Sequence, residues 1–168
     1  MHLDLNSFAA QCHTILKRDS GPKGRSEIAA LLRQVLQDPE AVKTYLNPNT
    51  PERELLYEDP ELGFCIVAHR YLGAKESEPH DHAHSWAIYG QAEGQTKMHD
   101  YTLLEKAHGD TLGKVRVART YALTPGVAHN YNEGDIHMPF RDGPTALIRI
   151  EGTNMAKVKR ARFTLVEG

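Results

Sequence analysis

The stretch Pro79-His80-Asp81-His82-Ala83-His84-Ser85-Trp86-Ala87-Ile88-Tyr89-Gly90 decides how the rest of the chain is interpreted. It holds three of the ten histidines, His80, His82 and His84, at alternate positions. Because alternate residues of a β-strand point to the same face, a strand here would line up three imidazoles. Two of them would be able to bind one transition-metal ion together with a third ligand from another part of the chain. The alternative is a solvated, histidine-rich edge without a metal.

Length and composition predict one ordinary globular domain. The 168 residues are enough to bury a core, and the net charge of -2 favours neither a nucleic-acid nor a membrane partner. No apolar run is long enough to span a bilayer, and the N-terminus lacks the pattern of a signal peptide. The two cysteines, Cys12 and Cys65, lie far apart and indicate reduced thiols. We therefore expect a cytoplasmic protein.

Residues 1–50 predict an N-terminal helical arm. Apolar residues recur at helical spacing over residues 3–18, and Gly21-Pro22-Lys23-Gly24 predicts a break. Ser26 is a candidate cap for a second helix, and Asp38-Pro39 begins a short third helix that ends near Leu46. The apolar stripes of this arm need a partner surface, either the outside of a sheet or a second subunit. The second option favours a homodimer.

Residues 51–168 predict a β domain. Short runs rich in β-branched and aromatic residues alternate with turns that contain glycine, proline and aspartate. The expected strands are Glu54–Glu58, Phe64–Leu72, His80–Tyr89, Gln95–Leu103, Val115–Leu123, Val127–Tyr131, Ile136–Phe140, Ala146–Glu151 and Arg162–Val166. Short strands at this spacing are typical of a sandwich or a small barrel rather than a βαβ sheet.

The third metal ligand has several candidates among the other histidines of the β domain. His108 lies in a loop signature, and His69 and His99 each stand alone in a predicted strand, which is more typical of a structural histidine. His129 and His137 remain, in a run that contains the turns Pro125-Gly126 and Gly134-Asp135.

These motifs resemble the cupins, a family of double-stranded β-helix (jelly-roll) proteins. Gly73, His80, His82 and Gly94 resemble the first cupin motif, with one extra residue between Gly73 and His80. Gly126, Gly134 and His137 resemble the second motif, in which Asn132 replaces the usual proline. The resemblance covers about residues 60–155. It implies an all-β jelly-roll barrel with an N-terminal helical arm, and a metal site of His80, His82 and His137 rather than His129.

One departure from the general motif bears on the chemistry. The carboxylate that usually follows His-x-His is missing, and Trp86-Ala87 stand in that region. This resembles the three-histidine branch of the cysteine (thiol) and diketone dioxygenases, although their Ser-x-His-x-Tyr relay is replaced by Leu147-Ile148-Arg149-Ile150-Glu151, so cysteine is not carried over as the substrate.

The resemblance implies a non-haem Fe(II) dioxygenase that acts with O2 on a small anionic or metal-chelating molecule. Ni, Mn or Zn would also fit three imidazoles. The alternatives are a metal-dependent isomerase or hydrolase, with the metal as Lewis acid, and a non-catalytic cupin that binds a small molecule.

Arg149, Glu151 and Tyr131 are candidate catalytic residues, and other residues are candidates for the substrate pocket. Arg149 and Glu151 share one face of a strand, where they form either a rim ion pair or a pair in which Arg149 holds a substrate carboxylate and Glu151 orients it. Arg70 is a second candidate for an anion clamp, or a solvated strand-end residue. Tyr131 would offer a phenol to the pocket. The remaining candidates for the pocket wall are His84, Trp86 and Met98.

Overall fold

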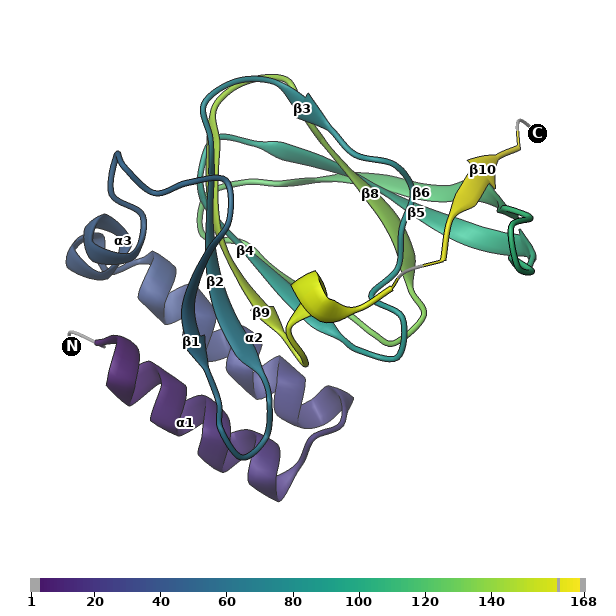
Figure 1. The fold of residues 1–168 in the computed structure, drawn as a ribbon. Coiled ribbons are helices and arrows are strands. Elements are labelled where there is room, and N and C mark those ends of the chain that lie inside the picture. Colours follow the sequence, from purple (N-terminus) through teal and green to yellow (C-terminus); the bar gives the residue numbers. More distant parts are fainter. Residues whose placement is uncertain (1–3, 160, 167–168) are drawn as a thin grey trace.

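The computed structural model describes residues 4–159 and 161–166 of the chain. Three helices come first in the described residues (Figure 1). The helices are α1 (Leu5–Arg18), α2 (Pro22–Leu36) and α3 (Pro39–Tyr45). Side-chain caps begin two of them, because Asp4 accepts a hydrogen bond from the Ser7 backbone and Asp38 accepts one from Glu40. The predicted helix start at Leu3 lies outside the described residues.

The second helix begins earlier than the sequence predicts. Gly21 is its N-cap residue and Pro22 occupies the first turn, where the missing N–H of proline costs no helical hydrogen bond. Ser26 lies inside the helix and donates to the carbonyl of Pro22. The predicted break between the first two helices is confirmed, but it spans residues 19–21 instead of Gly21–Gly24, and the predicted cap at Ser26 is wrong.

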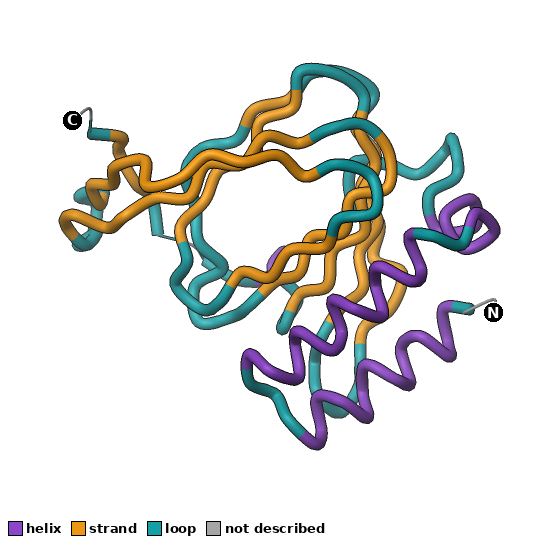
Figure 2. Tube along the Cα trace, turned by 180° about the vertical axis from the view of Figure 1, so that it is seen from behind, coloured by secondary structure: helices purple, strands orange, loops and turns teal. Residues whose placement is uncertain are grey.

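The described residues form ten strands in two five-stranded sheets. Figure 2 shows the strands of both sheets in orange. The first sheet has the order β1-β2-β9-β4-β7 and the second the order β10-β6-β5-β8-β3. The strands are β1 (Glu54–Glu58), β2 (Cys65–Tyr71), β3 (Lys75–Glu76), β4 (Ala87–Glu93), β5 (Thr96–Glu105), β6 (Gly113–Leu123), β7 (Ala128–Tyr131), β8 (Ile136–Arg141), β9 (Thr145–Glu151) and β10 (Phe163–Leu165). A 3-10 turn, η1 (Met155–Lys157), follows β9. The two sheets curl toward each other as the predicted double-stranded β-helix, which confirms the fold class.

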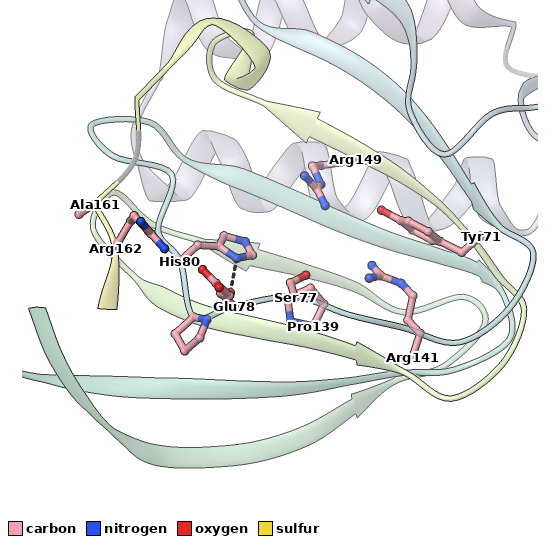
Figure 3. Close-up of a pocket in the computed structure, with 10 residues that line it drawn as sticks. Tyr71, Ser77, Glu78, His80, Pro139, Arg141, Arg149, Ala161 and Arg162 are labelled. Carbon is pink, nitrogen blue, oxygen red and sulfur yellow. Dashed lines mark hydrogen bonds between the residues drawn. The ribbon is translucent and has the colours of Figure 1, made fainter. Parts of the chain in front are cut away.

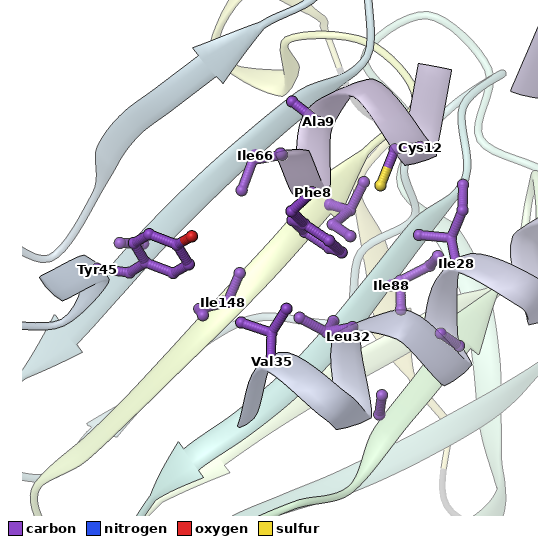
Figure 4. Packing of buried hydrophobic residues seen from close by; sticks show 14 of the residues in the cluster. Phe8, Ala9, Cys12, Ile28, Leu32, Val35, Tyr45, Ile66, Ile88 and Ile148 are labelled. Atoms are coloured by element: carbon purple, nitrogen blue, oxygen red, sulfur yellow. The ribbon is translucent and has the colours of Figure 1, made fainter. Parts of the chain in front are cut away.

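The helices cover the outer face of the first sheet. Ile66, Ile88 and Ile148 point from three neighbouring strands toward the helices, and they pack in one buried cluster with Phe8 and Leu32 (Figure 4). The apolar stripe of the helical arm is thus buried within the same chain, so it no longer supports a homodimer. Since side chains alternate along a strand, the residues directly before and after each of these isoleucines face the barrel interior.

The predicted strand His80–Tyr89 is wrong over residues 80–86, because β4 begins only at Ala87. His82 and Ser85 close a tight turn through a 2.9 Å backbone hydrogen bond, and Ala83 has a positive φ of 53°. The turn prevents the three histidines from lining one face of a strand. The other predicted strands are confirmed to within a few residues at each end, and the short β3 was not predicted.

The described helices give no candidate for a membrane-spanning segment, because none is both long enough and apolar enough to cross a bilayer.

Candidate metal centre

His80, His82 and His137 converge inside the barrel. Each offers a ring nitrogen, and these three atoms lie within 4.8 Å of one another. His82 and His137 are fully buried, and His80 is partly buried. Ring centroids are 4.7 Å apart for His80 and His137 and 4.8 Å apart for His82 and His137.

A short backbone pairing brings the two motifs together. The N–H of His80 donates to the carbonyl of His137, and the N–H of His137 donates back to His80, both at 2.9 Å. These bonds make an isolated bridge between the loop before β4 and the start of β8. His82 follows in a turn that Asp81 stabilises, because its side chain accepts a 3.1 Å hydrogen bond from the N–H of Ala83.

The hydrogen bonds of the rings indicate which nitrogens face the centre. Nδ1 of His80 lies 2.9 Å from the carbonyl of Glu78, so this nitrogen carries the proton and leaves the lone pair on Nε2. The hydroxyl of Tyr89 lies 3.1 Å from Nε2 of His82 and 3.1 Å from Nε2 of His137. The Nε2 atoms of His82 and His137 therefore face one point.

This donor set fits a divalent transition metal. Imidazole suits iron, nickel, zinc and copper, and three imidazoles on one ion leave coordination positions open for a ligand. Within the described residues, the group contains no carboxylate beside the three histidines. His80, His82 and His137 are the residues that would hold the ion.

A cavity of about 400 Å³ opens beside His80 (Figure 3). Its lining is mostly polar and comes from both sheets and the C-terminal segment: Tyr71, Ser77, Glu78, Pro79, His80, Pro139, Arg141, Arg149, Ala161 and Arg162. This volume suits a small molecule.

Arg149 and Glu151 face the barrel interior and are buried, with 7% and 0% of their surfaces exposed. Arg149 lines the cavity, and its guanidinium carbon lies 4.3 Å from the centre of the Tyr89 ring. Arg53 holds both carboxylate oxygens of Glu151 at 2.8 and 3.0 Å, whereas Arg149 is 3.6 Å away. Burial by itself would raise the pKa of Glu151, but the hydrogen bonds from Arg53 and the charge of Arg149 outweigh it, so the pKa is lowered. The pair is thus interior, and not a rim ion pair.

Tyr131 and Met98 lie close to the centre but outside the cavity. The Tyr131 ring is 4.2 Å from the His137 ring, while its hydroxyl points to that of Tyr121, 2.6 Å away. Burial raises the pKa of Tyr131. Met98 is buried in the apolar cluster that also contains Tyr89.

The structure does not bring His84, Trp86 or Arg70 to the three histidines. His84 is exposed in the turn, and Trp86 packs in the cluster under the helices. Arg70 binds Glu93 and the carbonyls of Leu46 and Asn47. His129 lines a second cavity, and burial lowers its pKa.

Two interior residues near the centre, Tyr89 and Arg141, were not among the predicted functional residues. A period of two along the strands would have found both. Arg141 lies four residues after His137 on β8, and Tyr89 lies two after Ala87 on β4, with both pairs facing the interior. Arg53, which precedes β1, carries no such signal, because its role depends on Glu151, 98 residues away.

Similarity to known proteins is found by structure and not by sequence. No family model and no curated protein matches the chain by sequence. Several solved structures are similar, among them an uncharacterized protein with a double-stranded β-helix domain from Klebsiella pneumoniae, at 17% identity and a TM-score of 0.48 over 73% of this chain and 88% of that one. A cupin-2 domain protein from Shewanella frigidimarina has 14% identity and a TM-score of 0.45 over 70% and 95%. The Cnp3 cupin domain of Schizosaccharomyces pombe has 10% identity and a TM-score of 0.45 over 62% and 66%. Similarities this low transfer no activity.

Proposed function

We propose that the protein is a metal-dependent dioxygenase that holds Fe(II) through His80, His82 and His137 and oxidises a small anionic or metal-chelating molecule. The convergence of three imidazoles, two of them fully buried, without a carboxylate in the described group carries this proposal. Three neutral ligands leave the ion its full charge, which favours a chelating anion together with O2. When bound, the iron would supply the activation of dioxygen.

The side chains around the histidines have separable roles in this proposal. Arg149 binds an acidic group of the substrate, because its guanidinium lines the cavity and its nearest carboxylate, Glu151, is held by Arg53. The hydroxyl of Tyr89 holds or donates a proton at the point that the Nε2 atoms of His82 and His137 face. The buried setting excludes water from this point.

Oxygen consumption by the iron-loaded protein tests the proposal. We expect O2 uptake with at least one member of a panel of thiols and diketones, and none with the zinc-loaded protein, which has no redox chemistry. Product formation without O2 uptake would contradict the dioxygenase and favour a metal-dependent isomerase or hydrolase. Tight ligand binding without any turnover would replace it by a non-catalytic binding cupin.

We also propose a homodimer, which rests only on the resemblance to the cupins, since members of that family commonly form dimers, and a cytoplasmic location. The location rests on Cys12 and Cys65, which are buried and free, as is typical of proteins kept in a reducing compartment. Light scattering at micromolar concentration tests the dimer, and a monomer at that concentration contradicts it.

A further inference from the structure

Two arginines face the cavity from opposite sheets. Arg149 lies on β9 of the first sheet and Arg141 lies on β8 of the second, and Figure 3 shows both side chains extending into the space beside Tyr71. Both belong to the same cavity lining as His80.

Arg141 is buried without the partners that a guanidinium normally has. Only 2% of its surface is exposed, and its Nε and Nη2 atoms have no hydrogen-bond partner within residues 4–159 and 161–166. Among the described residues, the contact that stands out is the ring of Tyr71, whose centre lies 4.3 Å from the guanidinium carbon. Burying a charge in this way costs free energy unless an anion satisfies it.

Arg149 is also short of partners. Its buried Nε atom has no hydrogen bond to any residue that the structure describes, and Glu151 lies 3.6 Å away with both oxygens already bound by Arg53. The described residues that line the cavity include three arginines, Arg141, Arg149 and Arg162, and one carboxylate, Glu78. These charges sum to +2. An anion with two negative charges would neutralise this lining.

We infer that Arg141 and Arg149 form an anion subsite, and that the ligand is a small dicarboxylate. One carboxylate lies between the two guanidiniums, whose planar forks match carboxylate geometry. The second carboxylate points toward the three histidines. The position of this second group rests on the proposed function, whereas the arginine subsite does not require a metal.

Titration calorimetry with succinate tests the subsite in the full-length protein, both metal-free and zinc-loaded. We expect succinate to bind at least tenfold more tightly than butyrate, which has the same carbon chain and one carboxylate. Arg141→Met and Arg149→Met should each weaken succinate about 10- to 100-fold, because each removes charge-assisted hydrogen bonds. Arg119→Met is the matched control, since Arg119 is exposed and pairs with Asp100 outside this cavity.

The outcomes separate this inference from the proposed function. Succinate binding that persists in metal-free His137→Ala and is lost in Arg141→Met supports the subsite even if no dioxygenase activity is found. Equal binding by wild type and Arg141→Met, or no binding of succinate by wild type, overturns the subsite. Butyrate binding as tightly as succinate, or inorganic phosphate binding more tightly, overturns the dicarboxylate.

The melting temperature gives a second readout, because a ligand-binding role and a structural role of Arg141 predict changes of opposite sign in Arg141→Met. Arg141→Met should raise the melting temperature of the protein without added succinate and reduce the rise that succinate causes, since Nε and Nη2 of Arg141 are buried and have no hydrogen-bond partner among the described residues. A lower melting temperature in the variant without added succinate would show that Arg141 supports the fold, and would overturn its assignment to ligand binding.

Discussion

The hydroxyl of Tyr89 lies 3.1 Å from Nε2 of His137, a nitrogen that the proposed site assigns to the metal. The same hydroxyl is 3.1 Å from Nε2 of His82. A phenol in contact with two proposed ligand atoms would lie beside a molecule bound between them. Its role can be separated from metal binding.

Replacing Tyr89 by phenylalanine should leave the metal in place and slow turnover about a hundredfold, because the change removes only the hydroxyl and its proton. Metal analysis and O2 uptake on the same iron-loaded sample measure the two effects. Loss of metal in Tyr89→Phe would make the phenol a ligand, and unchanged turnover would reduce it to a wall of the site.

The two candidate third ligands give a direct comparison. His137→Ala should lose stoichiometric metal, because His137 lies in the three-histidine group, whereas His129→Ala should keep it. His80→Ala is the positive control for loss. Elemental analysis of the purified proteins measures the difference, and metal that persists in His137→Ala but is absent from His129→Ala contradicts the site.

Arg53→Met should lower the free energy of unfolding by about 3 kcal/mol, because it leaves the buried carboxylate of Glu151 without its closest partner. Lys75→Met removes an exposed ion pair with Glu52 and should cost less than about 1 kcal/mol. Urea denaturation of both variants measures the contrast. Equal costs would mean that Arg149 compensates Glu151 without Arg53.

Asp59 should make the stability depend on pH below about 5. Its carboxylate accepts hydrogen bonds from His13 on α1, from the hydroxyl of Tyr57 and from the backbones of Glu61 and Leu62. Burial by itself would raise its pKa, but these bonds outweigh burial and lower the pKa from 3.8 to about 2.

A carboxylate with a lowered pKa contributes stability that is fully present above its unfolded pKa and is lost as the pH falls through its folded pKa. The stability gap between wild type and Asp59→Asn should therefore be widest above about pH 5 and should narrow toward about pH 2. Chemical denaturation across this range measures the gap. A gap that is constant from pH 5 to pH 2 would show that Asp59 has an ordinary pKa.

Much of the fold follows from local patterns. The alternation of apolar residues and the turn signals predict most strands. The alternation of Ile148 and Ile150 with Arg149 and Glu151 predicts that the two polar residues share one face of β9, and the structure shows that this face is the interior. The resemblance carried by the motif glycines and the His-x-His spacing also implies the group of His80, His82 and His137. These features are local because each depends on residues within a few positions of one another.

The predicted placement of the histidines on one strand was nevertheless wrong. His80, His82 and His84 alternate in the sequence, but the turn at Ala83 takes His84 into solvent. His80 instead meets His137 through a backbone bridge between segments 57 residues apart. Periodicity cannot distinguish a strand from a loop that happens to alternate, since pairing with a distant segment decides which forms.

The sequence by itself determined the β domain and the helical arm, because their signals are periodicities and turn residues within short segments, and its motif resemblance implied the three histidines. Only the tertiary structure decided what surrounds those histidines. Arg53 reaches Glu151, Arg141 faces the same cavity as Arg149, and Tyr89 contacts His137 because antiparallel pairing between distant strands curls two sheets around one interior. Residue alternation assigns a side chain to a face, but only the long-range pairing determines which faces meet.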